Sequence, residues 1–260
     1  MPKPSTLWRL ESSSNPTSYL FGTMHVRDKS AYSHIEKALQ AMEFCTNLRC
    51  EIDLDKAKSE ILPEDYLIPD GMTISSLVGQ NKFERMRSII SKSFQMDLLN
   101  LNRFYPILAI NQMSEAILSE DHRFALDHFL WQKAKEKNLI TGGIETISSQ
   151  IMTLQTLDLS SQIKMLQEVT RNVSRFRKSI NSLVTLYEQE RIFEIYKMSK
   201  KSMGSLRDLL IYRRNKNMAE YIISNFSEPC FYAVGAAHLG GNKGVLAILK
   251  RNNIKLSPSH

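Results

Sequence analysis

Cysteine is scarce in this sequence, which contains only three cysteines among its 260 residues. Cys45, Cys50 and Cys230 lack the paired Cys-x-x-Cys spacing of a structural zinc site, and an odd number gives no disulfide framework. All three lie in apolar, strand-like surroundings. We therefore expect buried free thiols, and the absence of disulfides favours a reducing compartment.

Long apolar runs and serine-hydrolase motifs are also absent. No stretch approaches the ~20 consecutive apolar residues of a transmembrane helix, and residues 1–6 lack the apolar core of a signal peptide. As it stands, the sequence is expected to encode a soluble, cytoplasmic protein without a membrane span, or an exported one if a leader has been removed. No Gly-x-Ser-x-Gly elbow occurs, which argues against a serine hydrolase.

The charge excess is positive but dispersed. Lysine and arginine number 34 against 27 acidic residues, which gives a net charge of +7. The basic residues alternate with acidic ones in helical patterns and do not cluster with aromatic side chains, so we expect no nucleic-acid partner. The 42% hydrophobic content predicts a folded chain. Because no Gly, Ser or Pro linker interrupts it, we expect a single domain over residues 1–260.

Apolar periodicity predicts a helix-rich α/β fold of α+β character. Short strands are expected at residues 7–10, 18–21, 47–52, 139–145, 230–234 and 254–256. Helices are expected at residues 32–42, 77–118 with a break at Pro106, 124–137 and 245–250. Residues 146–226 contain no proline and one glycine, which predicts a mainly helical insertion, or cap. The expected architecture is a central mixed sheet with an N-terminal β-hairpin, flanking helices and this cap.

The most informative feature is a repeated strand ending. Gly22-Thr-Met-His25 follows the apolar Tyr-Leu-Phe, and Gly235-Ala-Ala-His238 follows Tyr-Ala-Val. Glycine at the end of a strand allows a sharp turn or a close approach, so the histidine is projected over the sheet edge. Ligands of open α/β sheets collect outside the carboxyl ends of the strands. The two histidines are therefore expected to meet at one edge.

Two glutamates, Glu51 and Glu145, lie at the ends of two further predicted strands. Two imidazoles and a carboxylate form a minimal divalent-metal set that leaves positions open for water and substrate. A bound water would then be the nucleophile, and the second carboxylate would act as general base or steer a substrate amine.

Each of these residues also has a purely structural interpretation. A histidine after a strand commonly bonds to a main-chain carbonyl, and a single Gly-x-x-His is a short, frequent pattern. Glu51 could be a surface charge beside a strand, and Glu145 could neighbour a helix cap. Arg214 lies beside Arg213 and, from spacing alone, resembles a helix-surface residue.

The ordered combination of four elements resembles the TraB/GumN family over residues 7–256. These elements are the hairpin leading into His25, Gly143-Ile-Glu-Thr146 followed by Gln150, Arg214-Asn215 followed by Met218, and the strand leading into His238. The family includes the TIKI metalloproteases, which act on Wnt proteins. The resemblance implies a fold related to erythromycin-esterase-like and ChaN-like proteins.

The resemblance also implies residue roles and a cofactor. It assigns His25 and His238 to the metal site, with Glu51 and Glu145 as acidic candidates for ligand or catalytic base, and gives Arg214 a polar catalytic role. A divalent metal is implied, manganese or cobalt in the TIKI branch, with zinc as an alternative. The residues expected to surround and orient the ligands are Gly22, Gly235, Gln150 and Asn215. Asp127 is also of interest, because relatives carry an acidic residue in that helix.

Three functions remain open at this point. The first is a metal-dependent hydrolase, a peptidase acting on a peptide or protein substrate, whose oligomeric state the sequence does not define. The second is a non-catalytic protein that holds a peptide pheromone or haem in the same pocket. The third is a metal-free esterase in which a histidine is the general base.

Overall fold

The computed structural model describes residues 4–13 and 15–259, and these form a six-stranded sheet with the strand order β4-β3-β5-β2-β1-β6. The strands are β1 (Leu7–Glu11), β2 (Ser18–Thr23), β3 (Asn47–Cys50), β4 (Ile140–Gly143), β5 (Cys230–Gly235) and β6 (Lys255–Pro258). Strand β1 is antiparallel to both of its neighbours, whereas β2, β5, β3 and β4 are mutually parallel. The predicted α/β fold with a mixed sheet and an N-terminal hairpin is confirmed. The predicted hairpin turn includes position 14, which lies outside the described residues.

Helices make up most of the rest of the chain. They are α1 (Ile35–Met42), α2 (Leu54–Glu60), α3 (Ile74–Val78), α4 (Gln80–Phe94), α5 (Pro106–Glu115), α6 (Leu126–Glu136), α7 (Ile147–Thr156), α8 (Leu159–Arg171), α9 (Val173–Glu188), α10 (Ile192–Ser202), α11 (Arg214–Ser224) and α12 (Val245–Arg251). Pro106 begins α5, at the position where a missing N–H costs nothing. A π-helical turn, η6 (Asp208–Arg213), leads directly into α11. In the ranges that the structure describes, no helix combines the length and apolarity needed to cross a membrane.

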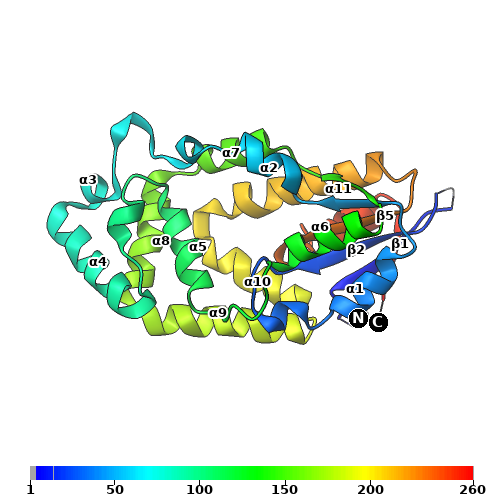
Figure 1. Cartoon of the computed structure of the whole chain (residues 1–260), viewed down its shortest axis with the longest axis horizontal. Coiled ribbons are helices and arrows are strands. Elements are labelled where there is room, and N and C mark those ends of the chain that lie inside the picture. The colour runs from blue at the N-terminus through cyan, green and yellow to red at the C-terminus, as the bar shows by residue number, and fades with distance from the viewer. Residues whose placement is uncertain (1–3, 14, 260) are drawn as a thin grey trace. The chain divides into compact units, whose positions relative to one another are not determined.

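The sheet is covered by helices on both faces (Figure 1). Helices α1 and α6 pack on the face that carries Phe231 and Ala233, while α11 and α12 pack on the face that carries Tyr232 and Val234. Alternate side chains of β5 therefore pack into opposite cores. Because both faces of the strand are buried, its sequence is one continuous apolar run. This pattern is typical of a parallel strand buried on both sides.

The three cysteines are buried free thiols, as predicted. Burial raises the pKa of the Cys45 and Cys230 thiols to about 12. They are therefore protonated at neutral pH and act as small apolar groups.

The chain divides into two compact units. The first consists of residues 1–60, 120–150 and 183–260 and contains the sheet. The second consists of residues 61–119 and 151–182, is helical, and has its own apolar core around Phe83, Ile90 and Leu166. All the side chains that were predicted to form the site lie in the first unit. The division into one domain with an insertion at 146–226 stays a prediction.

Candidate functional site

The carboxyl ends of four parallel strands lie side by side at one edge of the sheet. The register pairs Thr23 of β2 with Gly235 of β5, and Cys50 of β3 with Gly143 of β4. Polar residues follow these ends within three positions, and they are His25 after β2, Glu51 after β3, Glu145 after β4 and His238 after β5. Because the four strands are parallel and adjacent, the side chains predicted for the site originate from a single edge.

Arg214, the first residue of α11, joins the two glutamates. Its Nε donates to Glu145 Oε2 at 2.9 Å and its Nη2 donates to the same oxygen at 2.6 Å and also to Glu51 Oε2. Gln150 Nε2 donates to Glu145 Oε2 at 3.1 Å. The Arg214 side chain is 17% exposed and that of Glu145 only 7%. Charge-assisted bonds of this kind, made away from solvent, fix the orientation of both carboxylates. Arg214 is therefore not the surface residue that spacing alone suggested.

The second oxygen of Glu51 is bonded to the backbone of the opposite motif. Glu51 Oε1 accepts from the Gly235 N–H at 2.8 Å. A Cβ at position 235 would lie 3.1 Å from that oxygen, so glycine allows the carboxylate to approach the main chain. Burial alone would raise the pKa of Glu51, but the charge of Arg214, the charge that His238 carries below its own pKa, and the Gly235 N–H lower it to about 2. Glu51 is therefore ionised at neutral pH.

His238 is buried and held from behind. Its Nδ1 lies 2.6 Å from Asn215 Oδ1, and Asn215 Nδ2 donates to the Lys243 carbonyl at 2.7 Å. Because the amide nitrogen is committed to that carbonyl, the amide oxygen faces the ring and accepts from Nδ1–H. The lone pair of Nε2 then faces Glu51 Oε1, at a distance of 3.8 Å.

The protonation state of His238 follows from its surroundings. Burial lowers its pKa to about 4; Glu51 and Glu145 oppose this shift, and Arg214 adds to it. His238 is thus neutral at pH 7, which is the form of imidazole that binds metals. Asn215 therefore contacts the His238 ring, and its predicted role in orienting a metal ligand stays a prediction.

His25 is anchored separately, by a residue of helix α6. Its Nδ1 lies 3.0 Å from Asp127 Oδ2, while the other Asp127 oxygen accepts from Thr23 Oγ1 at 2.6 Å. The His25 side chain is 70% exposed and that of Asp127 only 12%. Since Nδ1 is engaged by Asp127, any metal or substrate bound by His25 has to use Nε2.

Two supporting contacts could not be found from sequence spacing. Tyr187 is buried and its hydroxyl donates to the Gly22 carbonyl at 2.9 Å, although 165 positions separate the two residues. Thr23 binds Asp127 across 104 positions. Apart from the family resemblance, Asp127 is only an acidic residue at the start of an amphipathic helix, which normally indicates a solvated helix terminus.

The donor set fits a divalent cation in part. Two ligands of one cation lie roughly 3 to 4 Å apart, given metal–ligand distances of about 2.0–2.2 Å, and His238 Nε2 and Glu51 Oε1 are 3.8 Å apart. Among residues 4–13 and 15–259, however, no three His, Cys, Asp or Glu side chains are grouped as a metal site. His238 and Glu51 are therefore two side chains in a chemical form that suits a cation, and metal binding by these two residues and by His25 stays a prediction.

Comparison with known proteins identifies the family. The model of the TraB/PrgY/gumN family matches residues 6–258. The chain belongs to this family. Among curated relatives, Metalloprotease TIKI2 of Danio rerio is 24% identical over 93% of the chain and 58% of its own length. Metalloprotease TIKI1 of Danio rerio is 22% identical over 97% of the chain and 62% of its own length. Metalloprotease TIKI1 of Homo sapiens is 23% identical over 97% and 61%.

The TraB/PrgY/gumN match covers both ends of the proposed site, because the matched residues include His25 and His238. The chain spans only 58% to 62% of the length of these three TIKI relatives. No solved structure matches the chain.

Proposed function

We propose that this TraB/PrgY/gumN protein is a metal-dependent hydrolase of the peptidase class. The observation that carries the proposal is His238, a buried neutral imidazole whose Nδ1 is fixed by Asn215 and whose Nε2 faces the ionised Glu51. Paired nitrogen and oxygen donors with a fixed tautomer are typical of a metal site with a supporting outer shell. The relatives named as metalloproteases are consistent with this chemistry.

In this proposal, Glu51 and His238 hold the metal and His25 completes the ligand set. Two imidazoles and one carboxylate suit manganese, cobalt or zinc, and manganese or cobalt is our first choice because of the resemblance to the TIKI branch. When bound, the cation would lower the pKa of a water molecule and polarise the scissile carbonyl.

The remaining polar residues act on the substrate and on the ligands. Arg214 holds Glu51 in position through one hydrogen bond from Nη2, and its charge keeps Glu51 ionised. Its Nε and Nη2 are engaged by the carboxylates, so a developing oxyanion or a substrate carboxylate would be met by Nη1. Glu145, locked by Arg214 and Gln150, is the residue that orients the guanidinium. We assign Glu51 as the metal ligand. Glu145 is then the second carboxylate, the one that acts as general base or steers a substrate amine.

One observation favours a second candidate, a metal-free hydrolase. His25 and Asp127 form an imidazole–carboxylate pair. In such a pair, the carboxylate fixes the tautomer of the histidine, which can then act as a general base. In that case, His25 Nε2 would remove the proton from water, and Arg214 would stabilise the oxyanion.

A peptidase assay in the presence and absence of metal separates these functions. Hydrolysis of a quenched fluorescent peptide library should stop in chelator and return when manganese or cobalt is added. His238→Ala should be inactive under all conditions, whereas the control His122→Ala, whose ring stacks on Tyr32 elsewhere in the unit, should be active. Full activity in chelator would overturn the metal-dependent proposal and support the second candidate. Saturable peptide binding without cleavage would support a ligand-binding protein instead.

A further inference from the structure

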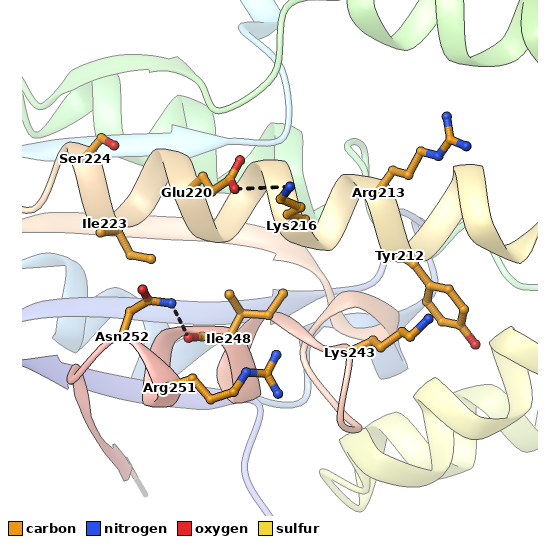
Figure 2. Close-up of a pocket in the computed structure, with 10 residues that line it drawn as sticks. All are labelled: Tyr212, Arg213, Lys216, Glu220, Ile223, Ser224, Lys243, Ile248, Arg251 and Asn252. Carbon is orange, nitrogen blue, oxygen red and sulfur yellow. Dashed lines mark hydrogen bonds and ion pairs between the residues drawn. The ribbon is translucent and has the colours of Figure 1, made fainter.

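A cavity lies on the first unit, and none of the proposed catalytic residues lines it. It is a groove of about 510 Å³ between helices α11 and α12, shown in Figure 2. On α11, Lys216, Glu220 and Ile223 lie three or four positions apart and therefore share one face of the helix. Arg214 of the same helix bonds Glu51 and Glu145. Helix α11 thus contributes to both the groove and the proposed active site.

The charged lining of the groove is mainly basic. Arg213, Lys216, Lys243 and Arg251 line it together with one carboxylate, that of Glu220. Lys216 and Glu220 form a weak pair at 3.7 Å, and both side chains are more than half exposed. Lys243 Nζ lies 4.2 Å from the centre of the Tyr212 ring, and Arg251 Nη1 donates to the Asn242 carbonyl. Arg213 pairs with Asp208, which lies outside the lining. The contacts of Lys243 and Arg251 bring no negative charge, so the groove keeps an excess of positive charge and attracts anions.

The floor of the groove is aliphatic. Ile223 and Ile248 are partly buried beside the core between α11, α12 and the sheet. The Tyr212 ring, the only aromatic side chain in the lining, is covered on one face by Lys243, so the groove has no row of bare rings on which bases stack. Basic walls over an aliphatic floor favour an acidic peptide with aliphatic side chains over a nucleic acid.

One hydrogen bond connects the lining of the groove to the proposed active site. The carbonyl of Lys243 accepts from Asn215 Nδ2, and Asn215 in turn holds His238. We propose that the groove is an exosite that binds an acidic, aliphatic segment of a protein substrate beside the scissile region. The exosite role rests on the proposed peptidase function, whereas the binding of the acidic segment does not.

Binding is tested with a short fluorescein-labelled peptide of Asp, Glu and Leu, followed by fluorescence anisotropy. The wild type should bind it saturably and more weakly as salt is added. The charge reversal Lys216→Glu with Arg251→Glu should weaken binding about tenfold, equivalent to about 1.4 kcal/mol. Thermal melting shows whether the charge reversal impairs folding. If it does, the neutral double variant Lys216→Gln with Arg251→Gln is used as a second test of binding. A matched reversal of two exposed lysines outside the groove, Lys82→Glu with Lys92→Glu, should leave binding unchanged.

The two proposals fail separately in this design. His238→Ala should bind the labelled peptide as the wild type does, although it does not cleave. Attaching the acidic segment to a cleavable peptide should lower KM without changing kcat in the wild type, and should have no effect in the groove variant. The inference is overturned if wild type and groove variants bind the peptide equally, or if a single-stranded oligonucleotide of equal charge binds the groove more tightly than the peptide.

Discussion

Arg213 and Arg214 are neighbours in the sequence with very different surroundings. Arg213 is 69% exposed and pairs with Asp208, whereas Arg214 is 17% exposed and bonds two glutamates. An exposed ion pair contributes about 0–1 kcal/mol to the free energy of unfolding. Removing the cation from a buried cluster leaves uncompensated carboxylates and costs about 3–5 kcal/mol.

These surroundings predict unequal effects of the same substitution. Arg214→Met should lower the free energy of unfolding by about 3–5 kcal/mol, while the control Arg213→Met should change it by less than about 1 kcal/mol. Urea denaturation followed by circular dichroism measures both. Equal effects at the two positions would show that the Arg214 cluster does not exist in solution.

In the proposed metal site, Asn215 would act as a positioning residue through its hydrogen bond with His238. Asn215→Ala removes the acceptor of His238 Nδ1–H and frees the tautomer, so affinity for the divalent metal should fall roughly 10- to 100-fold. Isothermal titration with manganese measures the affinity, and Asn252→Ala, which removes a capping amide at the end of α12, is the control. Unchanged affinity in a folded Asn215→Ala variant would contradict the role.

At the scale of elements, the end of β2 depends on a close approach. A Cβ at Gly22 would lie 2.7 Å from Leu239 Cδ1 and 3.1 Å from Ala236 Cα. Gly22→Ala should therefore destabilise the first unit by about 1–3 kcal/mol through overpacking. At Gly142 of β4, a Cβ would meet only the Arg49 side chain at 3.4 Å, so Gly142→Ala is the matched control. A smaller loss of stability in Gly22→Ala than in Gly142→Ala would refute this packing account.

The strand endings could be predicted from the sequence because their cause is local. Apolar runs closed by Gly22 and Gly235 reveal both the strands and their polar termini, and the parallel register then brings Glu51 beside Gly235. The inward placement of Arg214 could not be predicted, because it depends on the phase of α11 after the π-helical turn η6. The Thr23–Asp127 bond likewise depends on the docking of α6 against the sheet, which no local pattern encodes.

At the scale of the whole molecule, acid stability is linked to a long-range ion pair. Burial raises the pKa of Glu190, but Lys37 and the N–H and hydroxyl of Thr6 outweigh this and lower it from its ordinary 4.5 to about 2. Above pH 4.5 the carboxylate is charged in both the folded and unfolded chains, and its contribution to stability is complete. As the pH falls from 4.5 to 2, the unfolded chain binds the proton first, and the contribution is lost.

Glu190→Gln removes this linkage. The variant should be less stable than the wild type at pH 7, and its free energy of unfolding should fall less between pH 4.5 and pH 2. Denaturation at a series of pH values measures both effects. Glu194→Gln, an exposed position four residues away, should follow the wild-type profile. A parallel profile for Glu190→Gln would show that another group controls the acid transition.

In the proposed function, His238 and Glu51 bind a divalent cation. The most direct measurement is the metal content of the chain after incubation with manganese and removal of unbound metal, determined by mass spectrometry. Wild type and the control His122→Ala should each retain about one ion per chain, and His238→Ala and Glu51→Gln should retain none. Equal metal content in all four proteins, or no metal in the folded wild type, would contradict the account.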